Sequence, residues 1–436
     1  MSQKNPIRVY TSVPQRHTAS FYYRLQVPLR AAQALQLPVK AVVDTDSASV
    51  SNEDRVRIFS ESDIILLYQP VGESANHNVR GLQGFLPSKR EEGWKWAPSV
   101  VIETDDNLFN VSPLNHAFKG LGFRDMNGTE IPLGHHVGVM RDGERKVLWK
   151  DGEGGFSLAK NRQAIAAYRA ICEMADAIQC STPDVEQAVR REVTPRRSRV
   201  FPNSVLMSDY EQVDIRTDPD QVKILWQGGN AHYEDWYPLR EALGNITKKY
   251  PQVHWVIWGA SFPWVNELIP AHRMTLQPWC NYPEYKLRLA MVGHDINLAP
   301  LTDNVFNTCR SAIKWYESSV LKKPIPTLAQ NTAAYGREMV EGETGLLFND
   351  AKEFESQLGR LIEDATLRKT LGENAKDWVH ENRDAMKLVP EIVSFWEEMR
   401  EERKIEQPHV SDDEWREIVL QAEAEEMQEQ PIVPVG

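Results

Sequence analysis

The chain of 436 residues has only four cysteines (Cys172, Cys180, Cys280 and Cys309), with no Cys-x-x-Cys pair and no histidine at metal-binding spacing. Neither a disulfide framework nor a zinc site is supported, and reduced thiols are expected. Long apolar runs are also lacking, because the longest, such as residues 64–68, have the length of a strand. A membrane span needs about 20 residues. The start of the chain lacks the layout of a secretory signal, so we expect a cytoplasmic protein without a membrane span.

Internal repeats, low-complexity blocks and a Gly-x-Gly-x-x-Gly motif are absent as well, which argues against a solenoid and against a dinucleotide site. The net charge is −12, but its distribution is uneven. Residues 1–205 sum to +3 and residues 206–436 to −15, of which residues 401–436 supply −8. The mildly basic first half neither requires nor excludes a polyanionic partner such as DNA.

The chain is rich in short apolar segments that alternate with helical patterns. Continuous apolar strands separated by helices are typical of parallel sheets that are covered on both faces. The sequence therefore predicts an α/β protein with two Rossmann-like doubly wound domains that face a cleft, where such folds bind ligands. The expected strands are residues 7–13, 37–44, 63–70, 99–106, 177–182 and 199–204 in the first half, and 222–229, 253–260, 274–279, 294–301, 323–329 and 344–349 in the second.

The domain boundaries follow from this alternation and from an Asp/Pro-rich linker at residues 214–221. Residues 135–149, which lie in an insertion within the first domain, have the pattern of a β-hairpin that turns at Asp142-Gly143. The second domain is expected to contain helices at residues 233–249, 282–292, 308–321 and 351–371. The predicted parts are an N-terminal domain at 1–205 with an insertion near 119–156, a C-terminal domain at 206–385, a helix crossing back at 386–400 and an acidic tail at 401–436.

The predicted helix at residues 308–321 places Arg310, Lys314 and Glu317 on one stripe, since positions i, i+4 and i+7 share a helical face. Ser311 lies in its expected first turn, and a helix start attracts phosphate. A carboxylate at Glu317 suits the paired hydroxyls of a ribose. An exposed helix with an ordinary charge network is the alternative interpretation.

The segment from Asp295 to Ala329, followed by "YGREMVEGETGLLF" and "LIEDATLRKTLGENA", resembles the C-terminal domain of GT-B-fold glycosyltransferases, close to the retaining family 4 enzymes. The resemblance covers roughly residues 220–385, and it covers the first half only in layout. It implies transfer of a sugar from a nucleotide diphosphate sugar to a hydroxyl acceptor with retention of configuration, with Lys314 and Glu317 in the family's arrangement. The C-terminal domain would then bind the donor and the N-terminal domain the acceptor.

The sequence departs from the family eight residues before Glu317, where many relatives carry another glutamate and this chain has Cys309. Recognition of the sugar is therefore expected from Asp303, Asn304 and Asn307.

Two further segments are expected at the donor site. In "LWQGGNAHYEDW", Gly228 and Gly229 follow a strand and let the backbone approach a ligand. Asn230 is expected to cap the next helix, with His232 in its first turn pointing into the cleft. The alternative is a plain turn with a surface histidine. For the nucleobase, the candidate stacking residues are Trp279 and Tyr282, although aromatic residues here are as often part of the core.

In the first domain, Glu103, Asp105 and Asp106 end a strand and would enter the cleft, where they can take the proton of the acceptor hydroxyl or hold the acceptor. Helix capping and solvent exposure are the alternative. The loop after the first strand supplies four candidate acceptor-binding residues. These are Arg16, His17, Ser20 and Arg24.

The sequence thus predicts a glycosyltransferase that needs no metal and no cofactor besides its UDP-, GDP- or ADP-linked co-substrate. The "TDD" at residues 104–106 lacks the Asp-x-Asp spacing of a metal-binding triad. A glycan, a small molecule or a hydroxymethylated DNA base remain open as acceptors. The alternatives for the whole protein are a non-catalytic nucleotide-sugar-binding protein and a GT-B-like sugar-nucleotide epimerase.

Overall fold

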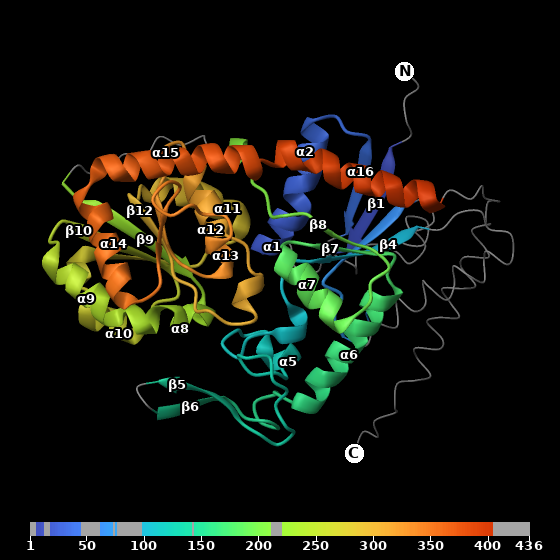
Figure 1. The fold of residues 1–436 in the computed structure, drawn as a ribbon, viewed down its shortest axis with the longest axis horizontal. Coiled ribbons are helices and arrows are strands. Elements are labelled where there is room, and N and C mark those ends of the chain that lie inside the picture. The colour runs from blue at the N-terminus through green and yellow to red at the C-terminus, as the bar shows by residue number, and fades with distance from the viewer. Residues whose placement is uncertain are drawn as a thin grey trace, which may run out of the picture.

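The computed structural model describes residues 6–12, 18–44, 62–72, 75, 98–141, 144–210 and 220–403. Two six-stranded parallel sheets, each packed between helices, lie side by side in it (Figure 1). This confirms the predicted α/β class with two Rossmann-like domains. Among the described helices, none is long and apolar enough to cross a membrane.

The sheet of the N-terminal domain has the strand order β2-β1-β3-β4-β7-β8, and every pairing in it is parallel. All six predicted strand segments are found. The strands are β1 Ile7–Ser12, β2 Val39–Asp44, β3 Ile64–Tyr68, β4 Ser99–Thr104, β7 Ala177–Cys180 and β8 Ser198–Val200.

The sheet of the C-terminal domain has the order β11-β10-β9-β12-β13-β14 and is also parallel throughout. This is the strand order of dinucleotide-binding Rossmann domains, in which the direction of winding reverses between the first and fourth strands. The strands are β9 Val222–Gly228, β10 Val253–Gly259, β11 Met274–Gln277, β12 Ile296–Ala299, β13 Thr327–Gln330 and β14 Leu346–Phe348.

Helices cover both sheets, and short 3₁₀ turns lie between some of them. In the first half the helices are α1 Ala19–Phe21, a π-helical turn η1 Tyr22–Gln26, α2 Val27–Ala34, α5 Phe118–Leu121, α6 Leu158–Met174 and α7 Pro183–Glu192. In the second half they are α8 Tyr233–Trp236, α9 Arg240–Lys249, α10 Pro263–Leu268, α11 Tyr282–Val292, α12 Ile313–Ser319, α13 Ala333–Gly336, α14 Ala351–Glu363, α15 Ala365–Asn382 and α16 Ala385–Arg403.

Three predicted helices differ from the structure. The helix expected at residues 233–249 is divided into α8 and α9 by a 3₁₀ turn, Tyr237–Leu239, which contains Pro238. The helix expected at residues 308–321 is only α12, because residues 307–309 form a separate 3₁₀ turn and Arg310 has extended backbone angles (φ −72°, ψ 158°). The helix expected at residues 351–371 is interrupted at Asp364, whose side chain accepts a hydrogen bond from the backbone N–H of Leu367 and starts α15.

The predicted hairpin is present as β5 Val137–Arg141 and β6 Glu144–Trp149, paired antiparallel, and it stands apart from both large sheets (Figure 1). Its turn residues, the linker at 214–219 and the tail beyond Arg403 lie outside the described residues. At the other side of the molecule α15 and α16 run in succession from the C-terminal to the N-terminal domain, where α16 packs on α2 (Figure 1). One buried apolar cluster continues from one domain into the other, with Tyr23 of the N-terminal domain and Leu225 of the C-terminal sheet among its members.

Candidate functional site: the carboxyl ends of β9 and β12

The loops after β9 and β12 meet at the point where the winding of the second sheet reverses. β9 pairs with β10 on one side and with β12 on the other, so the chain leaves these two neighbouring strands in opposite directions. The crevice outside such strand ends is where open parallel sheets bind their ligands. Two of the segments that the sequence assigned to the donor lie at these strand ends: Gly228–His232 at the end of β9, and the residues from Asn304 to Glu317 after β12.

The end of β9 is closely packed against the end of β10. A Cβ on Gly259, which has φ +98°, would lie 2.4 Å from the carbonyl oxygen of Gly228, and Ala260 donates its N–H to that oxygen at 2.8 Å. A Cβ on Gly228 would lie 2.6 Å from Cδ2 of His232, so the imidazole ring lies against this glycine. Gly229 has open space beside it. The close approach of ring to backbone therefore requires glycine at position 228.

The residue after these glycines does not cap a helix as predicted. Asn230 is the first residue of a 3₁₀ turn, Asn230–His232, whose preceding residue Gly229 has no side chain with which to cap. Asn230 itself is exposed.

In the loop after β12, the polar side chains bind the loop itself. Oδ1 of Asn304 accepts hydrogen bonds from the backbone N–H groups of Phe306 (3.0 Å) and Asn307 (2.9 Å). Nδ2 of Asn307 donates to the carbonyl of Thr302 at 2.8 Å, and both asparagines are buried. Asp303 is exposed. The two asparagines shape the loop, and their predicted contacts with a sugar stay a prediction.

The stripe predicted for Arg310, Lys314 and Glu317 is wrong as a helical face, because α12 begins only at Ile313. The Asn304 side chain accepts hydrogen bonds at the start of the preceding 3₁₀ turn, and the extended backbone at Arg310 separates that turn from the helix. Lys314 and Glu317 do share α12, and Ser311 precedes it. The hydroxyl of Ser311 accepts a hydrogen bond from Nδ2 of Asn203, in the N-terminal domain, at 2.9 Å.

Three cationic or protonatable side chains converge at these loops. The pKa of Lys314 is lowered to about 8, chiefly by burial; the Asp235 carboxylate opposes this shift and the charge of Arg310 adds to it. Burial and the charge of Lys314 also lower the pKa of His232, again against Asp235. An anion bound among them would relieve the mutual repulsion of these groups. The site is therefore suited to a phosphate-bearing ligand.

Glu317 is buried and is bound by three tyrosines rather than turned toward solvent. Oε1 accepts hydrogen bonds from the hydroxyls of Tyr23 and Tyr282, the latter at 2.6 Å, and Oε2 accepts one from Tyr285 at 2.8 Å. Burial raises the pKa of Glu317, which these hydrogen bonds and Lys314 oppose. Because Tyr23 belongs to η1 of the N-terminal domain, this contact joins the two domains. A ribose could take its predicted place only if a tyrosine hydroxyl withdrew.

The two candidate stacking residues differ in accessibility. Tyr282 is buried, and its ring packs on Tyr22 (centroids 4.7 Å apart) and on Tyr285 (5.1 Å). Trp279 is 73% exposed. Of the two, Trp279 has the ring that is accessible to a nucleobase.

Glu103 and Arg24 are buried together inside the N-terminal domain. Nε of Arg24 lies 2.7 Å and its second terminal nitrogen 2.6 Å from Oε1 of Glu103, and Gln179 donates to Oε2 at 2.8 Å. Arg24 also donates to the carbonyl of Phe201 at 2.6 Å. Burial raises the pKa of Glu103 to about 7 against the effect of Arg24. Arg24 and Glu103 thus form a buried salt bridge, and the catalytic and acceptor-binding assignments of these two residues stay predictions.

Asp105 and Asp106 follow β4 and differ in their surroundings. Oδ1 of Asp105 accepts hydrogen bonds from Gln69 (2.6 Å) and Tyr68 (3.1 Å). Burial raises the pKa of Asp106 to about 6, while Arg310 of the other domain is close enough to lower it. Asp106 is therefore the predicted carboxylate that stands opposite the candidate donor loops.

The remaining acceptor candidates are only partly described. Ser20 lies in α1, with its side chain near the hydroxyl of Tyr68. Arg16 and His17 lie outside the described residues.

Sequence reasoning missed three residues of this site. They are Tyr23 and Tyr285, which bind Glu317, and Asp235, which binds His232. Tyr23 is 294 positions from Glu317, so no spacing rule could connect them. For Asp235 a signal existed, because His and Asp three residues apart at a helix start can meet.

In the part of the chain that the structure describes, no group of three or more His, Cys, Asp or Glu side chains could hold a metal ion. Metal-independent transfer stays a prediction.

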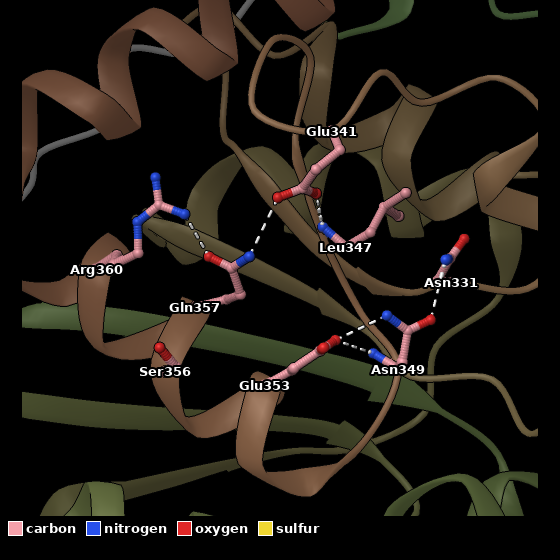
Figure 2. A pocket seen from close by; sticks show the side chains of 8 residues that line it. All are labelled: Asn331, Glu341, Leu347, Asn349, Glu353, Ser356, Gln357 and Arg360. Carbon is pink, nitrogen blue, oxygen red and sulfur yellow. Dashed lines mark hydrogen bonds between the residues drawn. The ribbon is translucent and has the colours of Figure 1, made fainter.

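A cavity of about 400 Å³ lies elsewhere in the C-terminal domain, beside β14 and α14 (Figure 2). Figure 2 shows its polar side chains directed at one another, with Gln357 between Glu341 and Arg360 and with Glu353 beside Asn349. These side chains are hydrogen-bonded to one another. The cavity lies at the edge of the sheet, away from the point between β9 and β12 where the winding reverses. We therefore do not assign the donor to it.

Comparison with known proteins gives matches only at the level of structure. No protein-family model and no curated sequence matches the chain. A sucrose-phosphate synthase from Thermosynechococcus elongatus is 13% identical, with a TM-score of 0.57, over 90% of this chain and 99% of that one. A glycosyltransferase from Rickettsia africae is 12% identical, with a TM-score of 0.57, over 91% and 99%.

A third similar structure is HepE from Anabaena in complex with UDP, which is 12% identical with a TM-score of 0.56 over 90% of this chain and 100% of that one. The chain has the GT-B fold. At these identities the comparison establishes the architecture of two facing Rossmann-like domains, as the sequence predicted, and the similarity to family 4 stays a resemblance.

Proposed function

We propose that this GT-B-fold protein transfers a sugar from a nucleotide diphosphate sugar to a hydroxyl acceptor. The observation that carries the proposal is that His232, Arg310 and Lys314 come together at the carboxyl ends of β9 and β12, where the winding of the second sheet reverses. The GT-B fold supports it, and so does the structure of HepE with UDP-glucose, which suggests UDP-sugars as the first donors to test.

In this proposal the diphosphate lies between the Gly228–His232 turn and Lys314, and Arg310 contacts it from the other loop. The diphosphate gains negative charge as the glycosidic bond breaks, so cations already in place stabilise the transition state more than the ground state. Glu317 binds the ribose after the hydroxyl of Tyr23 withdraws. Trp279 stacks on the base.

Asp106 is our candidate for the group that receives or orients the acceptor hydroxyl. It faces Arg310 across the domain boundary, and a carboxyl with a pKa near 6 can accept a proton at neutral pH. Retention of configuration is proposed from the family 4 resemblance of residues 220–385.

The proposal is tested by incubating the protein with UDP-, GDP- and ADP-sugars and measuring nucleotide release with and without candidate acceptors. We expect release with one donor class, and its loss in Lys314→Gln. A matched control is Lys323→Gln, because Lys323 pairs with Asp295 at the opposite end of the sheet at 2.9 Å. Absence of both release and nucleotide binding would end the enzyme interpretation.

The products distinguish the alternatives. A putative UDP-N-acetylglucosamine 2-epimerase from Listeria monocytogenes is also structurally similar, at 11% identity and a TM-score of 0.51 over 93% of this chain and 100% of that one. An epimerase would change the sugar without needing an acceptor, whereas a binding protein would release no nucleotide at all.

The acceptor class is tested by salt. A hydroxymethylated DNA base would bring the phosphate backbone into contact with the protein, and binding would weaken steeply between 50 and 200 mM salt. A glycan or a small hydroxyl compound would bind with little dependence on salt.

A further inference from the structure

A single buried carboxylate joins the two loops of the candidate donor site. Asp235, which is 5% exposed, lies in α8 just after β9. Its Oδ2 is 2.5 Å from Nδ1 of His232, and its Oδ1 accepts the backbone N–H of Thr302, in the loop after β12, at 2.7 Å. The hydroxyl of Thr302 adds a second link, because it donates to the carbonyl of Glu234 at 3.0 Å.

These contacts fix the direction of the His232 ring. Since Nδ1 is engaged by Asp235, the ring can meet a ligand only through Nε2. The ring is also held against Gly228, where no side chain would fit. Lys314 and Arg310 are the charged neighbours of the ring besides Asp235.

We propose that Asp235 is a positioning residue of the donor site. It holds the His232 imidazole and the β12 loop so that Nε2, Arg310 and Lys314 converge on the diphosphate of a nucleotide sugar. This inference rests on the proposed function. It assigns to the donor site a residue, Asp235, that does not touch the substrate.

The chain contains a matched control at the other end of the same two strands. Asp295 is also buried (8% exposed), and its Oδ2 accepts the backbone N–H of Lys223 at 2.9 Å. It thus joins the amino ends of β9 and β12 as Asp235 joins the loops at their carboxyl ends. A purely architectural role of such carboxylates would affect both positions alike.

The experiment first identifies which of UDP, GDP and ADP binds the wild type best. Calorimetry then measures the Kd of that diphosphate, and competition against it measures the Kd of the corresponding nucleoside. In Asp235→Asn the amide oxygen still accepts the Thr302 N–H, but the anionic partner of His232 is lost. We expect the Kd for the diphosphate to rise about tenfold, as for the loss of a charge-assisted hydrogen bond. The Kd for the nucleoside, which has no phosphate, should change less than twofold, and Asp295→Asn should change neither.

Two outcomes overturn the inference: an unchanged affinity for the diphosphate, or an equal loss for diphosphate and nucleoside. If Asp235→Asn does not fold, His232→Gln should show the same selective loss, and its absence there contradicts the inference equally. A wild type that binds none of the three diphosphates would instead remove the proposed function and this inference with it.

The conservative variants can also be combined. If Asp235 acts through His232, adding Asp235→Asn to His232→Gln should weaken diphosphate binding by less than twofold more. A full additional tenfold loss would show that the two side chains act independently and would contradict the positioning role.

Discussion

At the scale of single residues, Lys314 combines burial with a position in front of the candidate phosphate site. Its pKa of about 8 means that the side chain is charged below that pH and neutral above it. We predict that affinity for the nucleoside diphosphate falls as the pH rises through and above 8, the midpoint in the complex being higher because the bound anion favours the charged form. Calorimetry at pH 6.5 to 10 measures this.

The control for that titration is Lys314→Gln, which should bind about tenfold more weakly at pH 7 and lose most of the pH dependence. Unaltered pH dependence in the variant would assign the titration to another group.

A second prediction at this scale concerns the buried pair of Arg24 and Glu103. Arg24→Met leaves a buried carboxylate without its partner, and we expect a loss of about 3–5 kcal/mol in the free energy of unfolding. The folded-state pKa of Glu103 lies above its unfolded value, so stability is lost as the pH rises through it. The loss should thus be larger at pH 8 than at pH 5.

Urea denaturation at both pH values checks this prediction, with Arg190→Met as the control because Arg190 is 55% exposed and should cost less than about 1 kcal/mol. If Arg24→Met is as stable as the wild type and loses only acceptor binding, the result would contradict this prediction and support the acceptor-binding role predicted for Arg24 from the sequence.

At the scale of elements, the strands were predictable and the functional helix was not. The strand Ile64–Tyr68, for example, is a continuous apolar run bounded by Asp63 and Gln69, which is a signal that sequence alone carries. The start of α12 depends on a separate 3₁₀ turn, at whose start the Asn304 side chain accepts hydrogen bonds, and on the extended backbone of Arg310. The periodicity of the sequence contains neither.

The β9 turn gives the prediction that belongs to this scale. Gly228→Ala places a methyl group 2.6 Å from the His232 ring, and we expect a loss of about 1–3 kcal/mol in stability as the ring is displaced. Gly229→Ala, with open space at its Cβ, should be nearly neutral. Thermal or chemical unfolding of both variants measures the contrast, and equal stability of the two would show that the ring moves freely.

At the scale of the whole molecule, the contact between Tyr23 and Glu317 joins the two domains through the carboxylate that we assign to the ribose. The sequence identified Glu317 from the family pattern but could not show what binds it, because its partners come from η1 and α11. Donor binding must therefore compete with a contact between the domains.

This competition predicts that Tyr23→Phe binds the nucleoside diphosphate about three- to tenfold more tightly than the wild type, since a hydrogen bond that the ligand must displace is removed. Calorimetry of the variant is compared with Tyr168→Phe, which changes a buried tyrosine within the N-terminal core. Weaker binding by Tyr23→Phe would mean that Tyr23 supports the donor rather than competing with it.

The most direct test of the account is a crystal structure of the protein with a bound nucleoside diphosphate. We predict that the phosphates lie between the Gly228–His232 turn and the side chains of Arg310 and Lys314. The ribose hydroxyls should bind Glu317, and the hydroxyl of Tyr23 should have moved away from that carboxylate. A nucleotide bound at any other place, with Glu317 still held by its three tyrosines, would contradict the central claim.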